Sequence, residues 1–226
     1  MARASRRAAP RPYHHGNLAS ALVEAALALL GETQDWDFSL REVARRAGVS
    51  HNAPYKHFPE KRDLLAAVAA RGFEALAAHA LSALEGLTDA RARLIACGRA
   101  FVARGIANPA LYRLMFGAVL TSPEAGRPAI EKAAAAKARG VLDAIVADAV
   151  RSGAFPSSMA NPRQAAAASL ALWSILHGLT MLAIDDFVGP LRDVETLVDP
   201  ILGALLDGLT SHPPALPANI WLAPRL

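Results

Sequence analysis

Cysteine and aromatic residues are scarce in this sequence of 226 residues. Cys97 is the only cysteine, which excludes an internal disulfide and a cysteine-rich zinc site. Aromatic residues make up 6% of the chain, and the alternating β-branched and aromatic runs that are typical of strands are nearly absent. Hydrophobic residues nevertheless make up 53%, largely as the helix formers Ala and Leu. The composition therefore predicts an all-α chain with ample material for a core.

Acidic residues are missing from the first twelve positions, MARASRRAAPRP, which carry Arg3, Arg6, Arg7 and Arg11. The formal net charge of the whole chain is +4, so residues 13–226 are close to neutral. A basic arm ahead of a neutral body suits contact with phosphates, and the alternative is a solvated tail that only aids solubility. No apolar stretch of the signal-peptide type follows these charges, so we expect a cytoplasmic protein.

Long apolar runs without charge are also rare, and residues 165–184 form the one that is long enough to span a membrane. This run contains Ser169, His177 and Thr180, and two aspartates follow it at once. These polar residues favour a helix buried on all sides within the protein. A membrane-anchored regulator is the alternative, and cell fractionation would distinguish the two.

Helical spacing and capping residues divide the chain into about nine expected helices. The first is expected to begin at Asn17 and to end near Gly31. Ser39 and Glu42 have the spacing of a capping box at the start of the second, and Ser50 can cap a very short third helix. The other helices are expected at about 60–84, 88–107, 108–120, 124–152, 162–186 and 193–210.

Residues 48–61, GVSHNAPYKHFPEK, concentrate polar and aromatic side chains in a chain that is otherwise mostly apolar. Two short helices joined by AGVS have the spacing of a helix-turn-helix. The second helix of this motif enters the major groove, so its face needs donors and acceptors, while Tyr and Lys beside it suit phosphates. Its rear must still pack, which accounts for Val49, Ala53 and Phe58.

Residues 39–65, SLREVARRAGVSHNAPYKHFPEKRDLL, resemble the helix-turn-helix and linker of TetR-family transcriptional regulators at nearly every position of the family pattern. The upstream YHHGNLASALVEAALALLGE is similar to the first helix of that family. Farther on, LWSILHG at 172–178 resembles the Trp–His–Gly signature of one group of its C-terminal domains. The sequence departs from the pattern at Pro54, where Leu or Ile is common, and Pro59 precedes the linker helix.

The resemblance implies a helix-turn-helix DNA-binding domain followed by a helical ligand-binding and dimerisation domain. Such proteins mostly repress transcription and leave a palindromic operator when a small hydrophobic or aromatic effector binds. The expected parts are a flexible basic arm at 1–12, the DNA-binding domain at 13–59, the ligand-binding and dimerisation domain at 60–210, and a Pro-rich tail at 211–226.

The resemblance also assigns contacts with double-stranded DNA, position by position. Four residues would face bases: Ser50, His51, Asn52 and Ala53. Six residues would contact the phosphate backbone: Ser39, Arg41, Tyr55, Lys56, His57 and Lys61.

Aromatic and polar side chains recur on the predicted C-terminal helices at spacings that would bring them together. We expect them to line an effector pocket, and an ordinary core is the alternative reading for each of them. The candidate pocket residues are Cys97, Phe101, Tyr112, Met115, Phe116, Trp173, His177 and Thr180.

The last two helices carry small residues and a wide apolar stripe, which together predict a homodimer interface. A two-fold dimer would match a palindromic operator. The candidate interface residues are Ala171, Ser174, Gly178, Val198, Ile201 and Leu205.

Other functions remain as alternatives to a repressor. These are an activator of the same family and a helical DNA-binding protein without sequence preference. An enzyme is not expected, because no nucleophile, phosphate loop or paired carboxylates accompany His177. No cofactor is expected, and His51 and His57 are spaced to lie on different helix faces, which disfavours a metal site.

Overall fold

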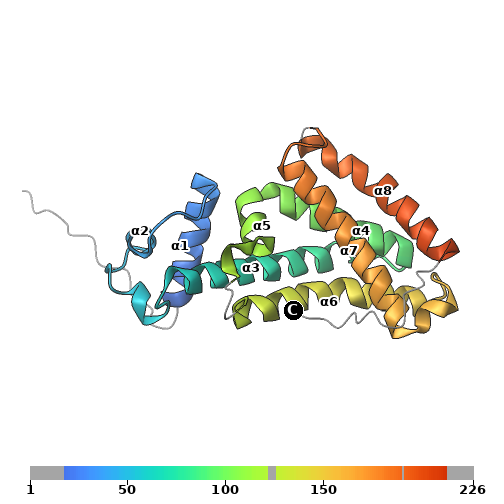
Figure 1. Cartoon of the computed structure of the whole chain (residues 1–226), viewed down its shortest axis with the longest axis horizontal. Coiled ribbons are helices and arrows are strands. Elements are labelled where there is room, and N and C mark those ends of the chain that lie inside the picture. Colours follow the sequence, from blue (N-terminus) through green and yellow to red (C-terminus); the bar gives the residue numbers. More distant parts are fainter. Residues whose placement is uncertain (1–17, 122–125, 190, 213–226) are drawn as a thin grey trace, which may run out of the picture.

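The computed structural model describes residues 18–121, 126–189 and 191–212. These residues form eight α-helices and three short 3-10 helices, with no strand, which confirms the all-α prediction (Figure 1). The basic arm, the Asn17 cap and almost all of the Pro-rich tail lie outside the described residues.

The N-terminal part consists of α1 (Leu18–Thr33), α2 (Leu40–Arg46) and the 3-10 helix η1 (Pro54–Lys56). Helix α1 continues two residues past the expected end at Gly31, because Gly31 keeps a helical backbone and Gln34 takes the left-handed conformation, with φ of 55°. Helix α2 ends before Gly48, whose φ of 70° suits glycine. The expected helix-turn-helix is therefore present as α2, a turn and η1.

The expected third helix is shorter than a regular recognition helix and forms only one 3-10 turn. Pro54 has no N–H to donate to the Ser50 carbonyl, and Pro59 disfavours a helical conformation at Phe58. Between the two prolines, the N–H groups of His57 and Phe58 both donate to the Pro54 carbonyl, at 2.9 and 2.8 Å. This single turn reduces the expected nine helices to eight α-helices in the described part of the chain.

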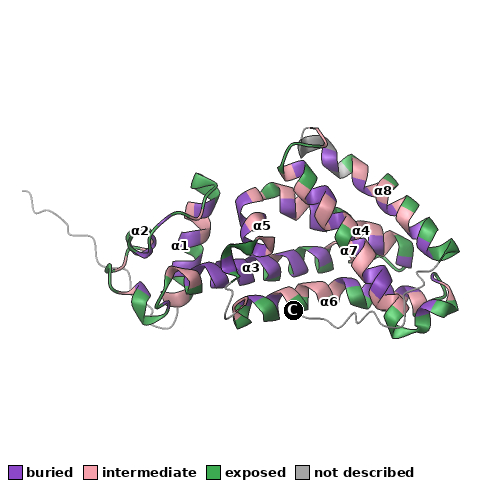
Figure 2. Ribbon diagram, viewed as in Figure 1, coloured by how far each residue is buried: buried purple, intermediate pink, exposed green. Residues whose placement is uncertain are grey.

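Helix α3 (Lys61–Ser82) connects the two halves of the molecule. It packs against α1 on one side and against α4, α5 and α6 on the other. Figure 2 shows that most of its length is buried. Its first turn is capped by Asp63, whose carboxylate accepts a hydrogen bond from the Glu60 N–H at 3.0 Å.

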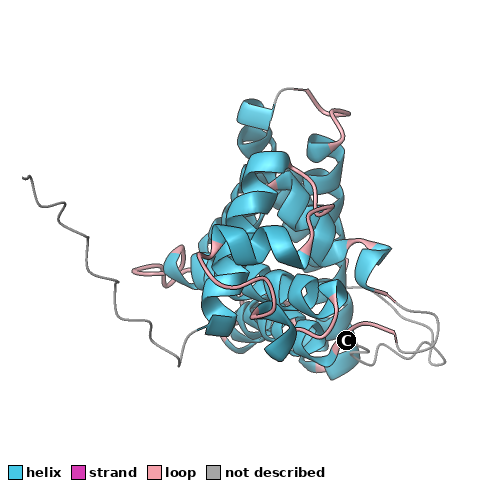
Figure 3. Ribbon diagram, turned by 90° about the vertical axis from the view of Figure 1, so that its left-hand side faces the viewer, coloured by secondary structure: helices cyan, strands magenta, loops and turns pink. Residues whose placement is uncertain are grey.

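The C-terminal body contains α4 (Ala90–Ala107), α5 (Pro109–Phe116), η2 (Ala118–Leu120), α6 (Ala129–Arg151), η3 (Ser157–Ala160), α7 (Pro162–Ile184) and α8 (Leu191–Ser211). Helix α6 lies alongside α3, α7 packs on α4 and α6, and α8 covers α4 and α7. The view from the side of α1 and α2 shows these helices stacked behind one another (Figure 3).

Helices α3 and α7 are each long and apolar enough to cross a membrane, judged by length and composition alone. In their most apolar stretches, 67% and 44% of residues are buried inside the protein. Helix α7 includes the run at 165–184 and packs against α4, α6, α8 and η3. The prediction of a helix buried on all sides is nevertheless wrong, because Ser174 and Leu182 are exposed.

Candidate nucleic-acid interface and ligand cavity

The turn between α2 and η1, together with η1 itself, presents most of the predicted DNA contacts to solvent. Ser50, His51, Asn52, Lys56 and His57 are exposed, and Tyr55 is 46% exposed. Ala53 is only half-buried. The structure thus brings the predicted base-reading residues together on one surface.

Buried residues directly beneath this surface fix its position. Pro54 and Phe58 are buried, and the Val49 N–H donates to the Ala44 carbonyl at 3.0 Å. Val43 and Ala44 of α2 are also buried completely. The exposed polar groups therefore stand on a packed base, which a groove-reading element requires.

The capping box predicted at the start of α2 is confirmed. The Glu42 N–H donates to Ser39 Oγ at 3.2 Å, and the Ser39 N–H donates to Glu42 Oε2 at 2.7 Å. The Ser39 hydroxyl also donates to Glu42 Oε2, at 2.9 Å. These bonds lower the pKa of Glu42. Ser39 therefore has a structural role in addition to any contact with phosphate.

Arg41 and Lys61, the two other predicted phosphate contacts, differ in their surroundings. Arg41 is exposed at the start of α2. Lys61 lies 3.5 Å from an Asp37 carboxylate oxygen and 5.8 Å from the centre of the Phe38 ring. Both groups are exposed or half-buried, so this weak pair leaves the ammonium free to exchange Asp37 for a phosphate.

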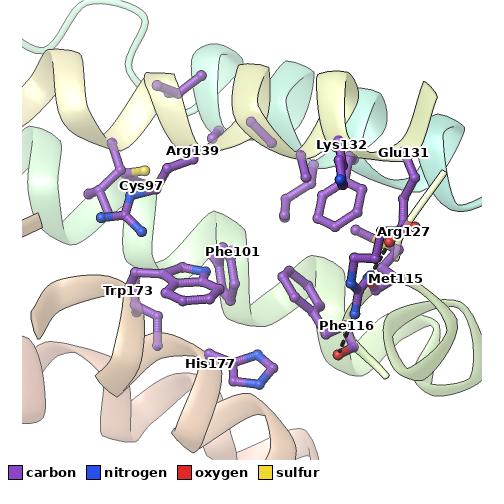
Figure 4. Close-up of a pocket in the computed structure, with 18 residues that line it drawn as sticks. Cys97, Phe101, Met115, Phe116, Arg127, Glu131, Lys132, Arg139, Trp173 and His177 are labelled. Atoms are coloured by element: carbon purple, nitrogen blue, oxygen red, sulfur yellow. Dashed lines mark hydrogen bonds and ion pairs between the residues drawn. The ribbon is translucent and has the colours of Figure 1, made fainter. Parts of the chain in front are cut away.

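A cavity of about 310 Å³ opens between α3, α4, α5, α6 and α7 (Figure 4). Its volume lies at the lower end of the range for sites that bind small molecules. Most of its lining is apolar or aromatic. The lining residues are Phe73, Leu76, Ala80, Cys97, Phe101, Met115, Phe116, Arg127, Glu131, Lys132, Ala135, Ala138, Arg139, Val141, Leu142, Trp173, Leu176 and His177.

Six of the eight residues predicted for an effector pocket line this cavity: Cys97, Phe101, Met115, Phe116, Trp173 and His177. Tyr112 and Thr180 do not line it. Both are buried, because Thr180 packs against Gly105 of α4, and the Tyr112 side chain lies behind His177. Helical spacing predicted that these two side chains line the pocket, but the structure places them in the core beside it.

Aromatic rings form one wall of the cavity. The His177 ring is stacked between Tyr112 and Trp173, with centroid distances of 5.6 and 5.7 Å. Phe116 packs against His177 at 4.9 Å, and Phe101 lies at 6.3 Å from Phe116. Burial lowers the pKa of His177, which favours the neutral imidazole. Burial likewise raises the pKa of the Cys97 thiol, another lining group, to about 11, which favours the uncharged thiol.

Four charged residues that the sequence analysis did not single out also line the cavity: Arg127, Glu131, Lys132 and Arg139. Arg127 forms an ion pair with Glu131 and donates to the carbonyls of Met115, Phe116 and Gly117. Arg139 pairs with Asp143 and lies 5.4 Å from the centre of the Trp173 ring. In the sequence, charges spaced four residues apart resemble a solvated helix face, which is why they gave no signal.

A second arginine connects this region to the DNA-binding half. Arg62, in the first turn of α3, donates from Nε and Nη2 to the Leu120 carbonyl at 3.2 and 2.9 Å. Nη2 also donates to the Gly126 carbonyl at 2.6 Å. Arg62 of α3 thus holds the carbonyls of Leu120 and Gly126, and Arg127 holds those of Met115, Phe116 and Gly117. We call the two arginines and the carbonyls that they bind the arginine clamp.

The predicted dimer surface is only partly available for a partner. Ser174 is exposed, and Ala171, Gly178, Ile201 and Leu205 are half-buried. Val198 is buried completely inside the chain, so it cannot reach a second copy. Two large exposed side chains near this surface were missed, Leu182 at 46% and Phe187 at 76% exposure. Val198 lies on the inner edge of the wide apolar stripe of α8, which the sequence pattern did not separate from the outer edge.

Among the residues that the structure describes, no group of three or more His, Cys, Asp or Glu side chains could hold a metal ion. His51 and His57 are both exposed in the predicted DNA-binding surface. The two candidate sites in the described part of the chain are thus the exposed polar surface around η1 and the mostly apolar cavity.

Comparison with known families agrees with this architecture. Residues 22–68 match the family of bacterial regulatory proteins of the TetR type, and residues 94–205 match a tetracycline repressor-like C-terminal domain. The chain belongs to the TetR family. Membership makes it a DNA-binding transcriptional regulator rather than an enzyme, and implies an operator and a small-molecule effector.

Solved structures with the same fold span a wide range of identity. A Rhodococcus sp. RHA1 protein of unknown function is 32% identical, covers 89% of this chain and 100% of its own, and has a TM-score of 0.74. The regulator FadR from Bacillus subtilis, in complex with stearoyl-CoA, is 15% identical over 84% of this chain and 98% of its own, with a TM-score of 0.64. A TetR variant from Acinetobacter baumannii AYE, in complex with minocycline, is 21% identical over 86% of this chain and 97% of its own, with a TM-score of 0.59. A search of curated protein sequences gave no significant match.

Proposed function

We propose that this TetR-family regulator is a cytoplasmic, dimeric repressor that leaves a palindromic operator when a hydrophobic or aromatic effector fills the cavity. The observation that carries the proposal is that one helix serves both sites. Helix α3 begins next to the predicted DNA contacts and contributes Phe73, Leu76 and Ala80 to the cavity. A shift of α3 upon ligand binding would therefore move the DNA-reading surface.

The arginine clamp gives this coupling a second physical connection. A ligand that displaces Phe116 or the Arg127–Glu131 pair would disturb the end of α5, whose carbonyls Arg127 holds. That end is joined through η2 to Leu120, which Arg62 of α3 holds from the other side. An effector needs to supply only about 1–3 kcal/mol of coupling free energy to weaken operator binding by roughly 5- to 150-fold.

The outer faces of α7 and α8 support the proposed dimer. Ser174, Gly178 and Leu182 are spaced along one side of α7, and a Cβ added at Gly178 would meet no other atom within 4 Å. Space beside small residues allows two helices to approach closely. Two copies related by a two-fold axis would place two DNA-binding surfaces on one operator, which matches a palindrome.

The fold does not specify the effector. The structures of the same fold named above contain ligands as different as stearoyl-CoA and minocycline. The aromatic wall and uncharged imidazole of this cavity support an apolar or aromatic compound.

The first test is selection of bound duplexes from a random DNA pool at two salt concentrations. A regulator that reads bases should enrich a palindrome with half-sites in register with the helical repeat. The variant Asn52→Ala should weaken binding to the selected site more than to random DNA, whereas His79→Ala, exposed on α3, should change neither. Binding without enrichment that vanishes as salt rises would instead support a non-specific DNA-binding protein.

The second test distinguishes a repressor from an activator. The selected operator is placed over a promoter, and transcription is measured in vitro with and without compounds that bind the cavity. A repressor should lower transcription until a compound releases it. Transcription that rises when the protein binds would show an activator and refute the proposal.

A further inference from the structure

The most unusual group in the cavity is the Glu131 carboxylate. Its side chain is 1% exposed although it lines the cavity, and Oε1 accepts a hydrogen bond from Arg127 Nη1. No donor in the described part of the chain reaches Oε2, which is itself buried. Figure 4 shows Glu131 and Arg127 at one end of the cavity, with Trp173 and His177 on the other side.

The structural role of Glu131 accounts for only one of its two oxygens. Arg127 holds three carbonyls at the end of α5, and the Oε1 contact neutralises its charge. Oε2 takes no part in this arrangement. A buried acceptor without a donor is unfavourable, so a ligand that supplies a donor gains affinity there.

The charges around the cavity indicate what kind of donor this is. Arg127, Lys132 and Arg139 are cationic, and Glu131 is the only carboxylate among the lining residues. The excess positive charge would repel a cationic ligand, whereas it would not repel a ligand with a neutral hydroxyl. The rings of Phe116, Trp173 and His177 offer flat faces to the rest of the ligand.

We propose that Glu131 is a specificity-determining residue of the cavity, and that its Oε2 accepts a hydrogen bond from the hydroxyl of a neutral aromatic effector. Effectors of this site are then phenol-like compounds whose ring lies against the aromatic wall and whose hydroxyl points to α6. The inference rests on the proposed function only in assigning this cavity to the effector. It adds the chemical class and the residue that selects it.

The test compares a matched pair of probes, 2-naphthol and 2-methoxynaphthalene, by equilibrium dialysis at neutral pH with the full-length protein. The two have the same ring system, and only 2-naphthol can donate a hydrogen bond. We expect the wild-type protein to bind 2-naphthol at least about tenfold more tightly, because only this probe satisfies Oε2. Equal affinities, or no binding of either probe, would overturn the proposal without requiring any variant.

The variant Glu131→Gln separates the role of Glu131 in selecting the ligand from its structural role as the partner of Arg127. The side-chain shape is kept, and an amide whose oxygen faces Arg127 presents N–H groups to the ligand instead of an acceptor. The preference for 2-naphthol should fall to less than about threefold or reverse. Lys132→Gln, which changes a neighbouring cavity charge without touching Oε2, should keep the wild-type preference. A Glu131→Gln protein that is folded by circular dichroism and retains the full preference would contradict the assignment.

Operator binding distinguishes this proposal from the proposed function. If 2-naphthol binds with the expected selectivity but does not release the operator, the ligand class stands and the repressor mechanism fails. If neither probe binds but other apolar compounds release the operator through the cavity, the repressor mechanism stands and the role of Glu131 is refuted.

Discussion

The Tyr112 hydroxyl lies 2.8 Å from Nδ1 of His177 and joins α5 to α7 immediately behind the cavity wall. The bond fixes the orientation of the imidazole ring that the cavity presents, and the two rings are stacked at 25°. Burial raises the pKa of Tyr112 well above its ordinary value, so the phenol stays protonated. A residue that does not line the cavity thus positions one that does.

Replacing Tyr112 by Phe removes this hydroxyl while keeping the ring and its packing. The His177 ring then loses its partner in a half-buried position, so we expect a loss of about 1 kcal/mol in the free energy of unfolding. Urea denaturation followed by circular dichroism measures this loss. Tyr55→Phe is the matched control, because Tyr55 is exposed in η1 and its loss should affect DNA binding but not stability. Equal midpoints for the Tyr112 variant and wild type would contradict the role of the bond.

The lowered pKa of His177 predicts a specific pH dependence of stability. In the unfolded chain the imidazole is protonated as the pH falls below about 6.5, whereas burial keeps the folded form neutral to lower pH. The contribution of neutral His177 to the free energy of unfolding is therefore complete above the pKa of His177 in the unfolded chain. It is lost as the pH falls toward the lower pKa of His177 in the folded protein. The variant His177→Gln should lose less stability than wild type between pH 7.5 and pH 5, measured by urea denaturation. Carboxylates with shifted pKa values titrate in both proteins, so the difference between the curves isolates His177.

Gly105 marks a close approach of α4 to α7 and to α5. A Cβ at this position would overlap Cγ2 of Thr180 and lie 3.0 Å from Cδ2 of Tyr112. Thr180 is buried and β-branched, so it cannot move aside, and we expect Gly105→Ala to cost about 1–3 kcal/mol of stability. The control is Gly140→Ala on α6, where nothing lies within 4 Å. That variant should gain about 0.5–1 kcal/mol, because alanine favours the helix. A stable Gly105→Ala protein would show that the two helices separate at little cost.

The sequence was most informative where a residue type has a single local use. Ser39 and Glu42 predicted the capping box, and the polar run at 50–57 predicted an exposed surface, because both depend on neighbours along the chain. The cavity depends on packing between distant helices, so helical spacing found Trp173 and His177 but also placed the buried Thr180 in it. Glu131 gave no signal, because its burial follows from how α6 lies against α3.

The outer faces of α7 and α8 predict the outcome of a charge introduced there. Leu205→Arg should give monomers in sedimentation velocity and should lose high-affinity operator binding, because the two half-sites are no longer bound together. Since Leu205 is half-buried, Ser174→Arg on the exposed face of α7 provides a second variant that removes no core contact. Ile130→Arg, at an exposed position on α6, should leave the oligomeric state unchanged. A monomeric variant that still binds the operator tightly would refute the proposed dimer.

Arg62 is the point at which the arginine clamp can be broken without touching either site. Lysine keeps the positive charge, but its single ammonium group does not reproduce the guanidinium fork that holds the Leu120 and Gly126 carbonyls. We expect Arg62→Lys to bind operator and effector almost normally when each is tested alone. With both present, the loss of operator affinity caused by the effector should fall below about fivefold, the lower end of ordinary allosteric coupling.

Arg71→Lys provides the control for this measurement, because Arg71 lies farther along α3 and its ion pairs within the described residues are with the surface residues Glu24 and Glu74. Both proteins are titrated with operator at zero and saturating effector, and the ratio of the two dissociation constants gives the coupling. By linkage, the same ratio must appear in the effector affinities with and without operator. If Arg62→Lys and Arg71→Lys both retain the wild-type ratio, the signal passes along α3 alone and the clamp only supports the fold.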